Sequence, residues 1–123
     1  MQGKIKLLIV DDEQSLRTIM KDELIEQGYD VNDADNGKTA LDILRKNIHD
    51  VVILDIRMDG MDGLEVLRQI RKDNLAHKVI MLTGVDELKI ARESLELGAN
   101  DFMTKPFQFQ NLFACIERVL KET

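Results

Sequence analysis

Segments of strand character alternate with stretches of helical periodicity five times along the chain, and this alternation is the feature that most constrains the fold. Two of the segments, Val51–Leu54 and Val79–Leu82, are entirely apolar, as expected for strands of a parallel sheet that helices cover on both faces. The sequence therefore predicts an α/β fold with a parallel sheet and right-handed crossovers. The five predicted strands are Ile5–Val10, Tyr29–Ala34, Val51–Leu54, Val79–Leu82 and Asp101–Thr104.

Apolar residues at helical spacing mark five helices between and after the strands. In the fourth helix we interpret Leu88, Ala91 and Leu95 as the core stripe. Ile90 and Leu97 form a second stripe there, which indicates either deeper burial or a surface for a partner. The positions that mark the other helices are Leu16, Ile19, Met20 and Leu24; Ala40, Leu41, Leu44 and Ile48; Leu64, Leu67 and Ile70; and Leu112, Cys115, Ile116 and Val119.

Cysteine and histidine are too sparse to indicate a site of their own. The single cysteine, Cys115, lies on the apolar stripe of the last helix, so we predict a small buried hydrophobe rather than a reactive thiol. His49 and His77 are interpreted as solvated residues in loops or at helix ends. Neither zinc-ligand spacing nor a Ser/His/Asp triad is indicated.

Size and charge narrow the possible functions. A chain of 123 residues fits one domain, which we place over residues 1–123, and 44% hydrophobic residues are typical of a globular protein. The net charge of -6 disfavours direct binding of nucleic acid, because the phosphate backbone is also negative. No apolar run reaches the length of a membrane span, and no signal-peptide core is found near the start. We therefore expect a cytoplasmic protein without membrane contact.

Polar side chains follow four of the predicted strands at the point where each strand ends. Asp11 and Asp12 follow the first strand, Asp55 the third, Thr83 the fourth and Lys105 the fifth. The carboxyl ends of parallel strands meet at one edge of a sheet, where ligands bind in open α/β folds. Each residue also has a simpler explanation: a helix cap for the first two, a polar loop residue for Asp55, a turn for Thr83 and a solvated surface charge for Lys105.

Taken together, these residues predict a site for a divalent cation and a phosphate. Three carboxylates on neighbouring strand ends repel one another unless a cation lies among them. Mg²⁺ takes oxygen ligands of this kind and commonly keeps water and substrate phosphate as its other ligands. A lysine ammonium and a threonine hydroxyl at the same edge supply hydrogen-bond donors for the phosphate.

The stretches LLIVDDEQSLR, ILDIRMDGMDGLEVL, MLTG and DFMTKPF resemble the successive motifs of response-regulator receiver domains, in order and over essentially the whole chain. The resemblance implies a flavodoxin-like, doubly wound sheet of five parallel strands in the order 2-1-3-4-5, with helices on both faces. It implies that Asp55 is the phosphoacceptor and that Asp12 is the more direct ligand of a Mg²⁺ ion. The other implied positions are Asp11 and the backbone carbonyl of Arg57 at the metal, Thr83 and Lys105 at the phosphate, Phe102 as an aromatic switch, and a cis peptide bond between Lys105 and Pro106.

Two departures from the family pattern stand near this site and at the last helix. Asp59 occupies the position where receivers often carry proline, which loosens the loop or adds negative charge beside the site. The last helix begins at Gln108 and Phe109, where a capping Asp or Ser is common.

The implied function is phosphoryl transfer from a sensor histidine kinase or a phosphotransfer protein to Asp55, which switches a surface for a downstream partner. Such a chain is not a multiple-turnover enzyme. No output domain is present, so the chain is either a stand-alone receiver or a part of a longer regulator.

Three alternatives compete with this function. A Mg²⁺-dependent phosphatase that forms an aspartyl-phosphate is expected to carry an Asp-x-Asp loop, in which the second Asp is the acid/base. In this chain Arg57 stands at the position of that second Asp, and arginine is a poor proton donor. A flavodoxin needs a phosphate loop rich in Ser, Thr and Gly after the first strand, where this chain is acidic. The third alternative, a phosphorylation-independent interaction module, is disfavoured because all the residues of the acceptor site are intact.

Overall fold

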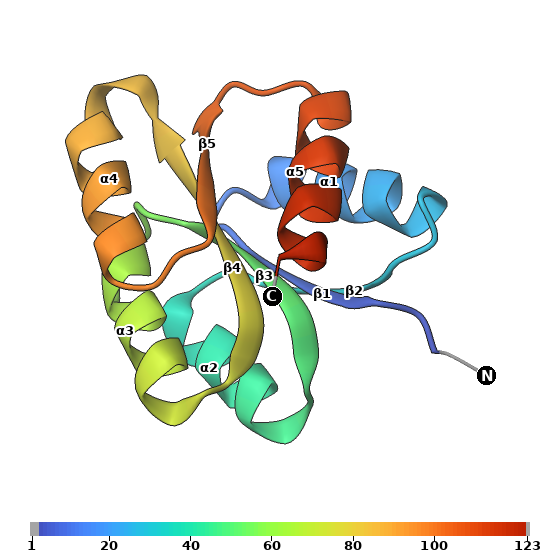
Figure 1. Ribbon diagram of the computed structural model, residues 1–123, viewed down its shortest axis with the longest axis horizontal. Coiled ribbons are helices and arrows are strands. Elements are labelled where there is room, and N and C mark those ends of the chain that lie inside the picture. Colours follow the sequence, from blue (N-terminus) through green and yellow to red (C-terminus); the bar gives the residue numbers. More distant parts are fainter. Residues whose placement is uncertain (1–2, 123) are drawn as a thin grey trace.

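The computed structural model describes residues 3–122, and its five strands form one parallel sheet in the order β2-β1-β3-β4-β5 (Figure 1). The predicted α/β fold and the strand order implied by the resemblance are both confirmed. The elements are β1 (Lys6–Val10), α1 (Gln14–Glu26), β2 (Asp30–Ala34), α2 (Gly37–Lys46), β3 (His49–Asp55), α3 (Gly63–Asp73), β4 (Ala76–Gly84), the 3₁₀ turn η1 (Val85–Glu87), α4 (Leu88–Glu96), β5 (Asp101–Lys105) and α5 (Phe109–Lys121).

Strands β3 and β4 extend beyond the apolar residues that predicted them. At their start, His49 pairs with Ala76, and at the end of β4, Gly84 pairs with Lys105 of β5. The strands continue there because backbone hydrogen bonding between neighbours does not depend on an apolar side chain. The extension places Gly84 beside Lys105, at the edge where the polar residues gather.

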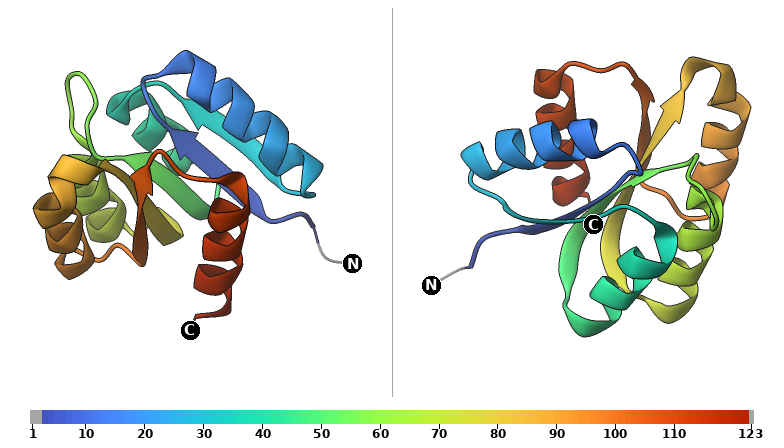
Figure 2. Two further views of the ribbon diagram at one scale, coloured as in Figure 1. Left: turned by 90° about the horizontal axis from the view of Figure 1, so that it is seen from above. Right: turned by 180° about the vertical axis from the view of Figure 1, so that it is seen from behind.

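The helices divide between the two faces of the sheet (Figure 2). Helices α1 and α5 cover one face through a cluster of buried side chains that includes Met20 and Ile116, and α2, α3 and α4 cover the other through a cluster that includes Leu41 and Ile70. Cys115 is 2% exposed within the first of these clusters, so its assignment as a buried hydrophobe is confirmed. Among residues 3–122, no helix has the length and apolar character needed to cross a membrane.

The expected core stripe of α4 is wrong in two of its three positions. Ala91 is fully buried, but Leu88 and Leu95 are each 41% exposed. Ile90 and Leu97 instead pack against the core. The helix is therefore rotated so that the predicted second stripe faces the sheet, and the choice between the two stripes was made by packing rather than by periodicity.

The predictions for His49, Ile48 and Ile19 are also wrong. His49 lies in β3 and is fully buried, where its ring nitrogens contact Asn32 Nδ2 at 3.1 Å and the Asn47 carbonyl at 3.0 Å. A buried imidazole is stable in this position because both nitrogens have partners. Ile48, expected on the stripe of α2, follows the end of that helix and is 84% exposed, and Ile19 of α1 is 50% exposed.

Gly63 begins α3 directly against the end of β3. A Cβ atom at this position would lie 2.7 Å from Ile56 Cα and would collide with the carbonyl of Asp55. Gly63→Ala is therefore expected to lower the free energy of unfolding by about 1–3 kcal/mol through overpacking. Gly3→Ala is the matched control, because a Cβ at Gly3 has nothing within 4 Å. Chemical denaturation of both variants tests the prediction, and equal midpoints would contradict it.

Candidate functional site

The three acidic residues predicted at the strand ends lie together at the carboxyl edge of the sheet. Asp11 and Asp12 follow β1 and Asp55 ends β3, and one carboxylate oxygen from each lies within 4.8 Å of the others. Asp11 is fully buried and Asp55 is 6% exposed, whereas Asp12 faces solvent. The parallel pairing of β1 with β3 produces this cluster, because it brings the ends of both strands to one level.

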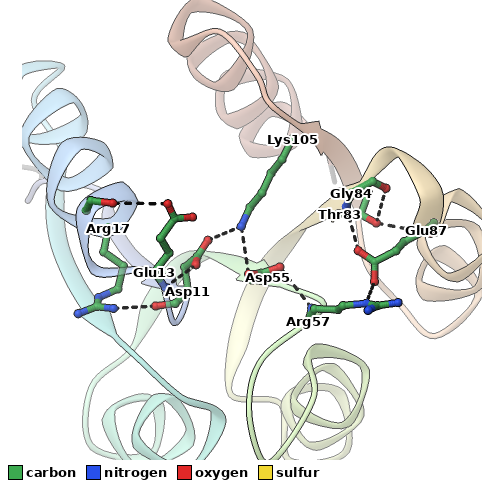
Figure 3. Close-up of polar contacts among 10 residues, drawn as sticks. Asp11, Glu13, Arg17, Asp55, Arg57, Thr83, Gly84, Glu87 and Lys105 are labelled. Atoms are coloured by element: carbon green, nitrogen blue, oxygen red, sulfur yellow. Dashed lines mark hydrogen bonds and ion pairs between the residues drawn. The ribbon is translucent and has the colours of Figure 1, made fainter.

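Lys105 connects the two buried members of this cluster (Figure 3). Its ammonium donates to Asp11 Oδ2 at 2.7 Å and to Asp55 Oδ2 at 3.0 Å. Its side chain is 25% exposed, so the interaction is only partly screened by water. The simpler explanation of Lys105 as a solvated surface charge is thus excluded, and its position beside Asp55 supports the predicted role in the site.

The electrostatics of the cluster favour binding of a further cation. Burial, reinforced by the charge of Asp11, raises the pKa of Asp55 to about 6, although Lys105 and the backbone N–H of Arg57 act in the opposite direction. Burial alone would lower the pKa of Lys105, but its hydrogen bonds and charge interactions with Asp11 and Asp55 outweigh burial and raise it. One ammonium thus compensates two buried carboxylates incompletely, and a third carboxylate lies beside them.

This donor set fits Mg²⁺. Carboxylate oxygens are ligands that Mg²⁺ prefers, and the exposed position of Asp12 leaves room for the waters that the ion retains. A shallow depression lined by Asp12, Arg57, Met58, Asp59 and Asp62 adjoins the cluster and opens it to solvent. Asp59, which replaces the proline common in receivers, is exposed on this rim.

Asp11 has a structural contact as well as a contact within the cluster. Its Oδ1 accepts a hydrogen bond from the Glu13 N–H at 2.9 Å, in the turn that leads into α1, while its Oδ2 pairs with Lys105. The guanidinium of Arg17 donates to the Asp11 carbonyl at 2.9 Å. The simpler explanation of Asp11 as a helix cap is wrong, because the N-cap of α1 is Glu13 and no side chain caps it; Asp11 Oδ1 instead fixes the turn before the helix, while Oδ2 belongs to the cluster.

Thr83 is fully buried near the end of β4, and its hydroxyl is directed toward the turn that follows (Figure 3). Thr83 Oγ1 lies 3.2 Å from the Gly84 carbonyl and 3.4 Å from the Glu87 carbonyl. The simpler explanation, a turn made with Gly84, is wrong, because Thr83 and Gly84 both lie in β4 and the turn begins after them at Val85. The role of Thr83 at a phosphate stays a prediction.

Sequence reasoning missed Glu87 and the side chain of Arg57. Glu87 is 7% exposed on η1, its Oε1 accepts from the Gly84 N–H at 3.0 Å, and its Oε2 pairs with Arg57 Nε. A glutamate beside a helix start reads as a solvated charge in sequence, and the short turn before α4 has no periodicity of its own. The pair of Arg57 and Glu87 links the loop after β3 to the loop after β4.

The remaining predicted positions lie on or beside β5. Phe102 is half-buried and packs against the cluster under α2, α3 and α4, and its residue in register on β4 is Met81. The peptide bond between Lys105 and Pro106 is cis. Helix α5 begins at Phe109 after Gln108, as expected.

Known proteins resemble this chain in sequence and in structure. Residues 7–117 match the family described as the response regulator receiver domain. The alkaline phosphatase synthesis transcriptional regulatory protein PhoP of Bacillus subtilis is 38% identical over 96% of this chain and 49% of its own length. The probable transcriptional regulator ycf27 of Guillardia theta is 43% identical over 100% of this chain and 48% of its own length. The chain therefore spans about half the length of these two relatives.

Solved receiver structures superpose closely on the fold. The receiver domain of NtrX from Brucella abortus has a TM-score of 0.90 and 31% identity, covering 95% of this chain and 99% of that one. The chemotaxis protein CheY4 of Vibrio cholerae has a TM-score of 0.89 and 31% identity, covering 95% and 99%. The family match extends over both the acidic cluster and Lys105, and the structural neighbours share the strand order of this sheet. The chain belongs to the family of response regulator receiver domains, the signalling modules of two-component response regulators.

Proposed function

We propose that this receiver domain accepts a phosphoryl group on Asp55 in a Mg²⁺-dependent reaction and that the domain extends over residues 1–123. The observation that carries the proposal is the position of the Lys105 ammonium, 3.0 Å from Asp55 Oδ2 and 2.7 Å from Asp11 Oδ2 within the acidic cluster. An ammonium there neutralises charge on incoming phosphoryl oxygens while Asp55 stays within reach of the phosphorus.

In the proposed reaction, a carboxylate oxygen of Asp55 attacks the phosphorus of a phosphohistidine. An O–P bond forms and the P–N bond breaks, with its electron pair returning to the imidazole nitrogen, which takes up a proton. Asp55 needs to be ionised to attack, and its pKa of about 6 leaves it mostly ionised at neutral pH. Lys105 then holds the phosphoryl oxygens, and Thr83 supplies a hydroxyl donor.

Asp11, Asp12, Asp55 and the backbone carbonyl of Arg57 are the proposed ligands of Mg²⁺. The bound ion would offset negative charge on the carboxylate and the phosphoryl oxygens as they approach one another. Asp12 faces solvent, and among the described residues Lys105 pairs with Asp11 and Asp55 rather than with Asp12. The Asp12 carboxylate can therefore coordinate Mg²⁺ without breaking an ion pair to Lys105.

The proposed phosphodonor is a sensor histidine kinase or a phosphotransfer protein, because the site is an acceptor of phosphate and its relatives are transcriptional regulators. The acquired phosphoryl group brings about -1.5 to -2 of charge and strong acceptor oxygens, which bias the neighbouring loops and Phe102 between two states. The proposed readers of this change are an output domain or a separate partner protein, rather than nucleic acid bound by this domain.

Incubation with a small phosphodonor such as acetyl phosphate tests the proposal. In the presence of Mg²⁺, intact-mass spectrometry should detect the addition of one phosphoryl group, and hydroxylamine, which cleaves acyl phosphates, should remove it. Chelation of Mg²⁺ should prevent the addition. An unmodified mass with both acetyl phosphate and phosphoramidate would overturn the proposed function.

Asp12→Ala is expected to raise the Mg²⁺ concentration needed for half-maximal phosphorylation about tenfold or more, because it removes a proposed ligand of the ion. Asp59→Ala, which removes another exposed acid on the rim of the same depression, is the matched control and should leave that concentration nearly unchanged. Phosphorylation rates measured over a Mg²⁺ titration compare the two variants. Equal requirements for Mg²⁺ in Asp12→Ala and the unsubstituted protein would exclude Asp12 as a ligand.

A further inference from the structure

Glu87 connects three parts of the molecule that surround the acceptor site (Figure 3). One carboxylate oxygen, Oε1, accepts from the Gly84 N–H at 3.0 Å, and the other pairs with the guanidinium of Arg57, two residues after Asp55. Its backbone carbonyl lies 3.4 Å from Thr83 Oγ1. One residue of the turn after β4 thus contacts the loop after β3, the last residue of β4 and the hydroxyl proposed to bind phosphate.

The burial of Glu87 makes these contacts consequential. The residue is 7% exposed, and a buried carboxylate is stable only when its oxygens have hydrogen-bond partners. Both oxygens are satisfied in this arrangement, by Gly84 and by Arg57. A rearrangement of the loop after β4 would therefore have to break or replace charge-assisted hydrogen bonds, which resist breaking more than neutral ones do.

The orientation of Thr83 depends on this arrangement. A threonine hydroxyl has one proton to donate, and in this structure the acceptors within its reach are the carbonyls of Gly84 and Glu87. Donation to a phosphoryl oxygen on Asp55 requires that the hydroxyl leave these carbonyls. Because η1 is held by the Glu87 side chain, the Glu87 carbonyl stays in place as the competing acceptor.

We propose that Glu87 is a positioning residue that holds Thr83 away from Asp55 and thereby opposes occupation of the acceptor site by a phosphoryl group. The inference rests on the proposed function and adds to it the group that stabilises the unphosphorylated arrangement. Any ligand that draws Thr83 toward Asp55 has to overcome the contacts of Glu87, so its affinity is reduced by the fraction of molecules held in the resting arrangement.

Binding of beryllofluoride, a phosphoryl mimic, tests this role in the presence of saturating Mg²⁺. Glu87→Ala removes both side-chain anchors of η1 and is expected to tighten beryllofluoride binding about threefold to tenfold, because a charge-assisted restraint on the resting state is lost. Asp86→Ala is the matched control, since Asp86 is an exposed acid in the same turn and the change in charge is identical. Its affinity should equal that of the unsubstituted protein.

The affinities are measured by NMR titration, following the backbone amides of Thr83 and Gly84. Glu87→Gln keeps the side-chain volume and an acceptor for Gly84 but loses the charge, so it should shift the affinity in the same direction by a smaller factor. It also provides the measurement if Glu87→Ala does not fold. Arg57→Ala in the Glu87→Ala background should add little further change in affinity, because the restraint it belongs to is already absent.

A purely structural role for Glu87 predicts a different result. It would lower the melting temperature of Glu87→Ala without changing the affinity of the folded protein for beryllofluoride. Unchanged or weakened binding in both Glu87 variants would overturn the inference, while the proposed function would survive as long as the unsubstituted protein binds the mimic. Failure of the unsubstituted protein to bind beryllofluoride or to accept a phosphoryl group would refute the proposed function itself.

Discussion

Asp55→Asn is expected to abolish phosphorylation by acetyl phosphate while leaving the fold intact. The amide is not a nucleophile at phosphorus, so no acyl phosphate can form. The exchange also removes one of two buried carboxylates that repel each other, and Asn keeps an oxygen that can accept from Lys105. We therefore expect unchanged or slightly greater stability together with complete loss of labelling.

Intact-mass spectrometry after incubation with acetyl phosphate and Mg²⁺ measures this loss. Asp59→Asn is the matched control, because it makes the same chemical exchange at an exposed acid on the rim of the site. That variant should be labelled to nearly the same extent as the unsubstituted protein. Full labelling of Asp55→Asn would show that another residue is the acceptor and would remove the basis for assigning the site to Asp55.

Lys105→Met is expected to lower the free energy of unfolding by about 2–3 kcal/mol near neutral pH in the absence of Mg²⁺. The substitution removes the ammonium that contacts both Asp11 and Asp55, and methionine fills most of the space of the lysine stem without a charge. Asp11 then stays fully buried beside Asp55 without this cation. The same variant should also accept the phosphoryl group much more slowly, since the proposed phosphate contact is lost.

The stability deficit of this variant should shrink as the pH falls. Lys105 lowers the pKa of Asp55, which is nevertheless raised to about 6, so removal of Lys105 raises that pKa further. A carboxyl group with a raised pKa binds its proton more tightly in the folded state than in the unfolded state, so protonation below the raised pKa stabilises the fold. The Lys105 ammonium is fully charged throughout this range, because its pKa is itself raised. The gap between the two proteins therefore narrows as the pH falls toward about 6, because Asp55 of the variant takes up its proton at a higher pH, and it stays constant below about 6, where Asp55 becomes protonated in both folded proteins.

Urea denaturation in the presence of a chelator, repeated across this pH range, measures the deficit. Lys89→Met is the matched control, because Lys89 is an exposed lysine on α4, and its unfolding midpoint should stay close to that of the unsubstituted protein. A deficit in Lys105→Met that does not change with pH would show that lost packing, rather than unpaired carboxylates, causes the destabilisation.

Much of the fold and the acidic cluster could be predicted because they depend on patterns that are local in sequence. Apolar segments such as Val51–Leu54 identify buried strands, and strand alternation with helices leads to a parallel sheet. A parallel sheet then places the residues after its strands at one edge, which is why Asp11, Asp55 and Lys105 were expected together and were found together. The strand order was implied by resemblance rather than by these patterns.

Other features depend on how elements pack, and packing is not written in the periodicity of a single segment. Leu88 and Ile90 lie on different stripes of α4, and both stripes are apolar, so only the contact with the sheet decided which was buried. His49 was expected in solvent but extends β3, since partners for both ring nitrogens become available only in the folded protein.

The sequence by itself determined which chemical groups this receiver domain places at the edge of its sheet, because strand ends and the residues that follow them are set by local composition. Only the tertiary structure decided which of these groups are paired and which way they face. Glu87 is buried against Arg57, thirty residues away in sequence, and the Thr83 hydroxyl is directed toward the Glu87 carbonyl. These contacts join segments that are separate in sequence, and such segments come together only when the whole sheet and its helices pack.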